Sequence, residues 1–213
     1  MDTALVIHAQ RHGRYVPNKN LRPFGNSCLL GMAFQKLAHV DAPCNKYVAT
    51  ADPEIRRMAQ RYPELKVIRM IPESAVGDGL AAAYEHLGRL PEEWFLDINP
   101  SYPLVSAEAW WDAIEQFLAT RPSGLVSAHR LDGALFDEGG FPVENLDAKQ
   151  VLNSAFRLVS KVSILNEGSY WPQDEGPPHG YHLPKTESWG IHEAEDLPAV
   201  EAIWSMSRLA LNT

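Results

Sequence analysis

The sequence lacks any apolar run near the roughly 20 residues that span a bilayer. Its first ten residues, MDTALVIHAQ, also lack the basic start and the apolar stretch of a signal peptide. Cysteine is scarce: only Cys28 and Cys44 are present, and no C-x-x-C pattern joins them. We therefore expect a cytoplasmic protein with reduced thiols and no membrane partner.

Positive charge is scarce as well. The chain has 19 lysines and arginines against 27 acidic residues, a formal net charge of −8. Because nucleic-acid binding needs a surplus of cations on one face, we expect no nucleic-acid partner, although a local cluster of cations can still hold a small phosphate compound. The length of 213 residues, with 45% hydrophobic and 22% charged residues, predicts one globular domain over 1–213.

Much of the positive charge gathers in the stretch HAQRHGRYVPNKNLRPFG at 8–25. Its basic residues are Arg11, Arg14, Lys19 and Arg22. Glycine is scarce in the same stretch, so neither G-x-x-x-x-G-K-[ST] nor G-x-G-x-x-G is present. Side-chain cations would have to bind phosphate instead, the arginines bidentately and the lysine as a point charge. The alternative is a solvated basic turn.

Short runs rich in valine, isoleucine and leucine alternate with segments of helical spacing, which predicts an α/β fold with a mostly parallel sheet. The predicted strands are 4–9, 47–50, 67–70, 94–98, 125–128 and 159–165. The predicted helices are 29–37, 53–62, 79–87, a helix capped by Ser106 and a last helix after Pro198. Segments 132–158 and 166–184 are rich in glycine, proline and acids, and we interpret them as insertions or loops over a site, with a disordered surface loop as the alternative for 166–184.

Polar residues at strand ends are candidate site residues, because ligands of open α/β sheets bind at the carboxyl ends of strands. Asp97 is a candidate metal ligand, although strand alternation can equally turn it to the opposite side. His192 is a candidate base or metal ligand, with a hydrogen-bonded structural histidine as the alternative. His8 lies within the first predicted strand, where we expect it to be packed. No G-x-S-x-G or catalytic cysteine pattern supports hydrolase chemistry.

Five stretches carry a resemblance to a known family. AQRHGRYVPNKNLRPFG is similar to the motif A-R-x-G-S-K-G-x-x-x-K-N-L, with Lys19, Asn20 and Leu21 retained and Arg14 in place of the loop lysine. The others are YVATADPEI, PESAVGDGLAAAYEHL, WFLDINPSYPL and PKTESWGIHEAEDLPAVEAIW, in the order of the family's segments. On these stretches the chain is identified as a divergent member of the cytidylyltransferases that make CMP-activated acid sugars, the CMP-sialic acid and CMP-KDO synthetases.

The resemblance implies a three-layer, Rossmann-like fold of the nucleotide-diphospho-sugar transferase type and transfer of CMP from CTP to an acidic acceptor. The implied nucleotide-binding residues are Ala9, Gln10, Arg11, Gly13, Arg14, Lys19, Asn20 and Asp78. Of these, Arg14 and Lys19 would act catalytically on the triphosphate. The implied acceptor-binding residues are Asn99, Ser101, Tyr102 and His192. The resemblance also implies Mg²⁺, with Asp97 as the candidate ligand, and a homodimer that pairs through the insertion at 132–158.

The chain departs from the family where the family's D-I-D pair of carboxylates holds Mg²⁺. Those two positions are Gly190 and His192, so a cation that prefers oxygen ligands loses both carboxylates. In addition, Ala51 replaces an aspartate and Val105 replaces an arginine. Two hypotheses follow. The first is a cytidylyltransferase, favoured by the basic loop, and the second is an inactive relative that binds a nucleotide or a partner as a regulatory module.

Overall fold

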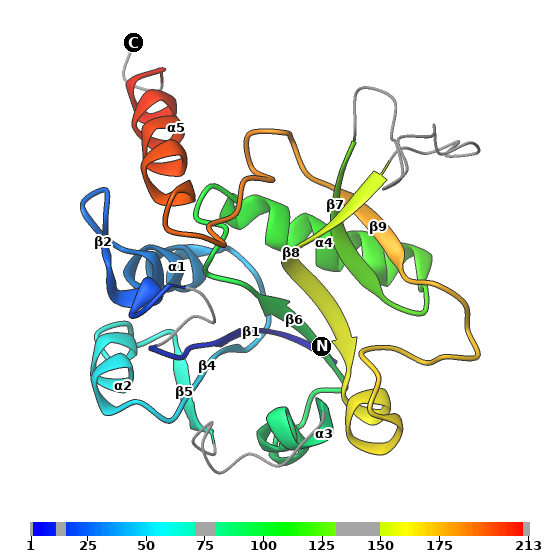
Figure 1. The fold of residues 1–213 in the computed structure, drawn as a ribbon. Helices are drawn as coiled ribbons and strands as arrows, with labels where there is room; N and C mark the ends of the chain where they lie inside the picture. Colours follow the sequence, from blue (N-terminus) through cyan, green and yellow to red (C-terminus); the bar gives the residue numbers. More distant parts are fainter. Residues whose placement is uncertain (1, 12–15, 71–79, 131–149, 211–213) are drawn as a thin grey trace.

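The computed structural model describes residues 2–11, 16–70, 80–130 and 150–210 (Figure 1). A seven-stranded sheet has the order β5-β4-β1-β6-β8-β7-β9. Its strands are β1 (Thr3–His8), β4 (Lys46–Thr50), β5 (Lys66–Arg69), β6 (Trp94–Ile98), β7 (Leu125–Arg130), β8 (Gln150–Ser160) and β9 (His179–His182). All neighbouring pairs are parallel except those of β8, which is antiparallel to β6 and β7. The predicted mostly parallel α/β fold is confirmed.

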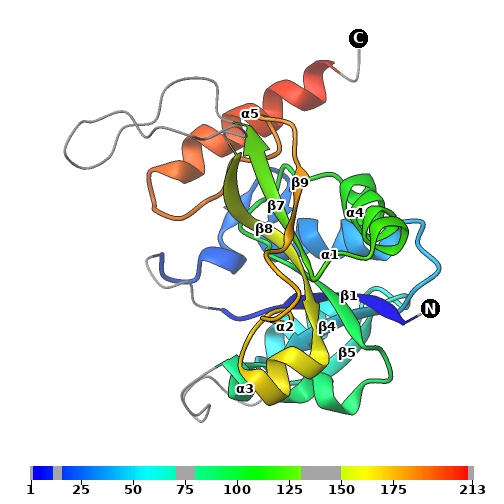
Figure 2. The ribbon, with the colours of Figure 1, turned by 90° about the vertical axis from the view of Figure 1, so that its right-hand side faces the viewer.

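The helices and the small hairpin complete the fold. The helices are α1 (Leu29–His39), α2 (Pro53–Ala59), α3 (Leu80–Ala83), α4 (Ala107–Thr120) and α5 (Asp196–Ala210). The hairpin consists of β2 (Pro23–Phe24) and β3 (Ser27–Cys28). Shorter helical turns cover Lys19–Leu21, Glu85–Arg89 and Ser163–Glu167. In Figure 2, α1 and α4 lie on one side of the sheet, while α5 extends beyond it.

Two apolar clusters cover the two faces of the sheet. Leu5, Ile7 and Leu96 face the larger cluster, to which α1, α2 and α4 contribute. Val6 and Phe95 face the smaller cluster, which includes residues of the Glu85–Arg89 and Ser163–Glu167 turns. Because β1 is buried on both faces, its sequence TALVIH is almost continuously apolar, as expected for a central parallel strand.

Local capping signals explain two helix starts. The Asp52 side chain accepts hydrogen bonds from the amides of Glu54 and Ile55, and Pro53 occupies the first helical position, where proline costs no hydrogen bond. Ser106 caps α4 as predicted, with its hydroxyl accepting from the Ala109 amide. The α4 side chains that fall on one face at helical spacing are buried: Trp110, Ala113, Ile114 and Phe117.

The predicted strand at 159–165 is wrong. β8 ends at Ser160, and Ser163–Glu167 forms a helical turn. β8 also begins at Gln150, so the last part of the segment 132–158, interpreted as an insertion, is a central strand of the sheet between β6 and β7. Antiparallel pairing with two distant strands decides this, and no local pattern records it. The dimer residues expected at 132–149 lie outside the described residues.

Smaller differences concern the other predicted elements. The predicted helix 79–87 is divided between α3 and the turn Glu85–Arg89. α5 begins at Asp196, two residues before Pro198, because proline is tolerated within the first helical turn. The predicted loop 166–184 contains the edge strand β9, which pairs with β7. None of the described helices has the length and apolar character needed to cross a membrane.

Candidate functional site

Three segments that are far apart in the sequence meet beyond the carboxyl ends of β1 and β6. The loop after β1 contributes Lys19, whose Nζ donates to the Ile191 carbonyl at 2.9 Å. The loop after β6 contributes Ser101, whose carbonyl accepts from the Ile191 amide at 2.8 Å. Residues 190–192 therefore connect the two loops. This is the edge at which open α/β sheets bind ligands.

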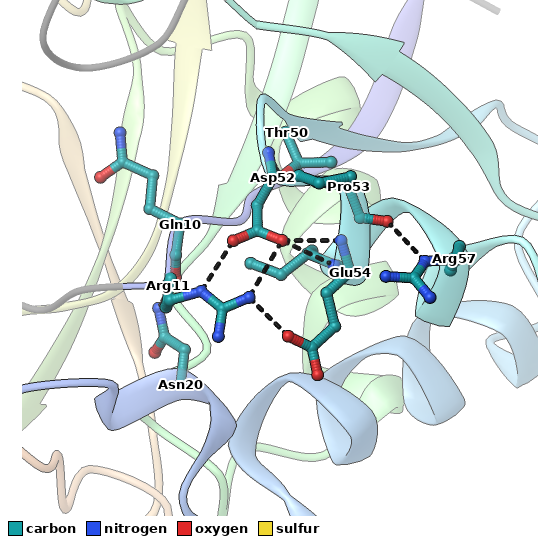
Figure 3. Close-up of polar contacts among 9 residues, drawn as sticks. Gln10, Arg11, Asn20, Thr50, Asp52, Pro53, Glu54 and Arg57 are labelled. Atoms are coloured by element: carbon teal, nitrogen blue, oxygen red, sulfur yellow. Dashed lines mark hydrogen bonds and ion pairs between the residues drawn. The ribbon is translucent and has the colours of Figure 1, made fainter.

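Two of the three guanidinium nitrogens of Arg11 donate to carboxylates (Figure 3). Its Nε lies 2.8 Å from Asp52 Oδ2, and its terminal nitrogen also donates to Glu54. Burial alone would raise the pKa of Asp52, but hydrogen bonds from Arg11 and from the first amides of α2 outweigh it and hold that pKa below its ordinary value. Arg11 is thus placed beside the first strand as predicted, and its charge is used to fasten α2 to the β1 loop.

Lys19 and Asn20 turn inward. Lys19 is half-buried, and burial lowers the pKa of its ammonium group although Asp196 acts in the opposite direction. Asn20 is buried, and its Nδ2 donates to the Gln10 carbonyl at 2.7 Å (Figure 3). Within the described part of the chain, the Asn20 Oδ1 atom accepts no hydrogen bond. A buried acceptor without a donor is costly, so it marks a place where a ligand's donor group would be stabilised.

The remaining predicted nucleotide-binding residues divide into two groups. Ala9 is fully buried and its amide donates to the Ala49 carbonyl, so it continues the pairing of β1 with β4. Gly13, Arg14 and Asp78 lie outside the described residues, and their roles stay predictions.

The predicted acceptor residues lie together. Tyr102 Oη lies 3.0 Å from Nε2 of His192 and also accepts from the Ser154 amide. Asn99 Oδ1 accepts from the Ser101 amide at 3.0 Å and so fixes the turn after β6. Burial raises the pKa of Tyr102, so its hydroxyl stays protonated. The structure therefore brings these four residues to one place, while acceptor binding itself stays a prediction.

Lys36 of α1 hydrogen-bonds to the backbone of the loop after β6. Its Nζ donates to the carbonyls of Pro103 and Val105, both at 2.6 Å. Burial lowers the pKa of this ammonium group to about 8, against the opposing effects of Glu187 and Glu108. Lys36 was not singled out in the sequence, because a single lysine in an amphipathic helix gives no signal of an inward orientation.

The described residues do not fit the Mg²⁺ site that the resemblance implies. A Cβ added at Gly190 would lie 2.6 Å from Cζ of Tyr102 and 2.8 Å from Nε2 of His192, so these side chains fill the place of a first carboxylate. Asp97 uses both oxygens elsewhere, and no three metal-binding side chains cluster within the described ranges. The role of Asp97 as a metal ligand stays an unsupported prediction.

Asp97 belongs to a polar cluster on the smaller apolar face. Its Oδ1 accepts from His8 Nδ1 at 2.8 Å, and its Oδ2 accepts from the Tyr84 hydroxyl at 2.6 Å. His8 Nε2 lies 2.9 Å from Nε2 of His86. Burial, and then the charge of His8, lower the pKa of His86 to about 3, so His86 is neutral. His8 is packed as expected, but within a hydrogen-bonded cluster.

Arg157 completes this cluster, and it is not among the site residues predicted from the sequence. It lies on β8 directly opposite Asp97 of β6, and its Nε is 4.0 Å from Asp97 Oδ2. Its guanidinium group stacks over the ring of Tyr170 at 4.3 Å. The available signal was an arginine within the apolar run AFRLV, a position where a charge is rare without a partner.

Comparisons with known proteins agree with this picture. A family model described as Cytidylyltransferase matches residues 6–151. CMP:2-keto-3-deoxy-manno-octonic acid synthetase complexed with CTP is 12% identical, with a TM-score of 0.72 over 97% of this chain and 100% of that chain. The 4-diphosphocytidyl-2C-methyl-D-erythritol synthase of Anaerococcus prevotii is 14% identical, with a TM-score of 0.68 over 95% of each chain. No curated protein matches the sequence. At these identities the two structures show the fold alone.

Proposed function

The chain belongs to the cytidylyltransferase family, and from this premise we propose that it transfers CMP from CTP to an acidic sugar or a related acid. A hydroxyl oxygen of the acceptor attacks the α-phosphorus of CTP, a new oxygen–phosphorus bond forms, and the α–β phosphoanhydride bond breaks. Pyrophosphate leaves and the hydroxyl proton is lost. The family match over 6–151 is the observation that carries the proposal.

The nucleotide part of the proposal rests on the loop after β1. Positioning and neutralisation of spread negative charge dominate phosphoryl-type transfer. We assign Lys19 and Arg14 to the triphosphate, and we assign Asn20 Oδ1 to a donor group of the nucleotide because this buried acceptor has no donor within the described residues. CTP binding by the 2-keto-3-deoxy-manno-octonic acid synthetase, which shares the fold, supports the choice of nucleotide.

The acceptor part rests on the loop after β6. Tyr102 and His192 hydrogen-bond to each other beside the turn of Asn99 and Ser101, so a sugar acid would meet a hydroxyl, an imidazole and an amide at one place. The synthetase of similar fold carries the name of a sugar acid, 2-keto-3-deoxy-manno-octonic acid, which supports an acid of this class.

A pyrophosphate-release assay tests the proposal. The protein is incubated with CTP and either 2-keto-3-deoxy-manno-octonic acid or sialic acid, with ATP, GTP and UTP as controls. We expect release with CTP and at least one acid. Replacement of Arg14 and of Lys19 by alanine should weaken CTP binding, and an unchanged affinity in both variants would show that the loop does not bind the phosphates.

A second function is favoured by one observation. Tyr102 and His192 occupy the space beside Gly190 where the resemblance expects a metal-binding carboxylate. A protein that binds CTP without transferring CMP, and acts as a regulatory module, would retain the β1 loop and tolerate this change. Selective CTP binding without pyrophosphate release for any acid would favour this second function.

A further inference from the structure

Arg157 has an unusual position for a charged residue. It lies in the interior of β8, between Phe156 and Leu158, which are both fully buried. The guanidinium side chain itself is 25% exposed. Within the described part of the chain, none of its five N–H groups donates a hydrogen bond to protein, although most buried polar groups have a partner.

Two contacts hold the guanidinium group without consuming its donors. The Tyr170 ring supports its flat face, and Asp97 lies at 4.0 Å, a distance at which charges attract without a hydrogen bond. Burial alone would lower the pKa of Arg157, but Asp97 and the neighbouring tyrosines outweigh it and raise that pKa, so the group stays charged. A planar cation is therefore fixed in orientation, with its N–H groups available.

The strand that carries Arg157 also contacts one of the predicted acceptor residues. The Tyr102 hydroxyl accepts a hydrogen bond from the amide of Ser154, which lies three residues before Arg157 on β8. The pairing of β7 with β8 is irregular between Arg157 and Leu152, and such bulges often re-aim side chains near active sites. In the order of the sheet, β6 separates β8 from β1, whose loop holds Lys19.

We propose that Arg157 binds the carboxylate of the acceptor and selects acids over neutral sugars. This inference rests on the proposed function and identifies the group that recognises the acid. A guanidinium group matches a carboxylate with two parallel N–H···O bonds, and the stacking on Tyr170 fixes the plane before the ligand arrives. A phosphate of CTP has the same chemistry, so the experiment below separates the two sources.

The test compares the binding of each acid with that of its methyl ester. Titration calorimetry uses 2-keto-3-deoxy-manno-octonic acid, sialic acid, their methyl esters and CTP. We expect the wild-type protein to prefer an acid over its ester by about tenfold or more, the usual contribution of a charge-assisted bidentate pair. Arg157→Met should abolish this preference and leave CTP affinity within about twofold. Arg157→Lys, which keeps the charge but not the fork, should retain part of the preference.

Arg89→Met is the matched control, because Arg89 is an exposed arginine that pairs with the exposed Glu85, one helical turn away. It should bind like the wild type, and thermal unfolding of each variant checks that the fold is kept. A preference for acids that survives in Arg157→Met would overturn the proposal, and a selective loss of CTP affinity would assign Arg157 to the triphosphate instead. Binding of CTP but of no acid overturns the carboxylate subsite alone, whereas binding of neither overturns the proposed function as well.

Discussion

The molecule uses its cations in two contrasting ways. In the loop after β1, the Arg11 guanidinium group donates to Asp52 and Glu54, and Lys19 donates to the Ile191 carbonyl. On β8, Arg157 is stacked and charge-balanced, but within the described residues its N–H groups make no hydrogen bond to protein. In the β1 loop, where positive charge is densest in the sequence, Arg11 and Lys19 therefore form bonds within the protein. In the apolar strand β8, the N–H groups of Arg157 are available to a ligand.

This difference separates two kinds of variant. Replacing a cation whose donors serve the protein should mainly lower stability, whereas replacing Arg157 should mainly lower acid binding, with a loss of stability limited to its charge interaction with Asp97.

The largest stability effect is expected for Asp97→Ala. The substitution leaves Arg157 without its buried counter-charge and leaves His8 Nδ1 and the Tyr84 hydroxyl without their hydrogen-bond acceptor, so we expect a loss of about 3 kcal/mol in the free energy of unfolding. Urea unfolding measures it, with the exposed Asp41→Ala as the control. A loss below about 1 kcal/mol would show that Arg157 does not depend on Asp97 for its position.

The lowered pKa of Lys36 predicts that the stability of the fold rises with pH above neutrality. Its pKa is about 8 in the folded chain, below the value of about 10.4 in an unfolded one. Between these values the unfolded chain binds more protons, so stability rises with pH, by about 2 kcal/mol at most between pH 8 and pH 10. Urea unfolding of wild type and Lys36→Met at both pH values should show the rise only in the wild type, and equal changes would contradict the assignment.

Lys19→Met should lower the free energy of unfolding by about 1.5 kcal/mol, because it removes a charge-assisted hydrogen bond to the Ile191 carbonyl that joins two distant segments. If the same ammonium group also meets the triphosphate, CTP affinity falls in parallel. A variant with normal stability and weaker CTP binding would place Lys19 with Arg157, among the cations that serve a ligand.

Arg11→Met should have the smallest effect. Arg11 is one-third exposed and Glu54 about half exposed, so solvent screens their interaction and we expect a smaller loss in the free energy of unfolding than for Lys19→Met. This loss should shrink as the salt concentration rises, since screening already weakens the pair in the wild type. A loss that does not change with the salt concentration would indicate that Arg11 contributes through packing of its side chain instead.

Local sequence patterns were enough to predict much of the fold. Asp52-Pro53 and Ser106 start helices through their own side chains, and TALVIH forms a strand because it is apolar on both faces. The site depended on contacts that no local pattern records. His8 and Asp97 are 89 residues apart in the sequence, and Arg157 meets Asp97 only because β8 pairs antiparallel with β6. The motif predicted the place of Lys19 and Asn20, but their inward hydrogen bonds come from packing.

Calorimetric titration of the purified protein with CTP, ATP, GTP and UTP, each with and without Mg²⁺, decides whether this chain binds the nucleotide of its family. We expect selective binding of CTP. Strengthening by Mg²⁺ would show that carboxylates other than the missing D-I-D pair assist the nucleotide. Absence of binding for all four nucleotides would contradict the account, because the family relationship would then record ancestry without the activity.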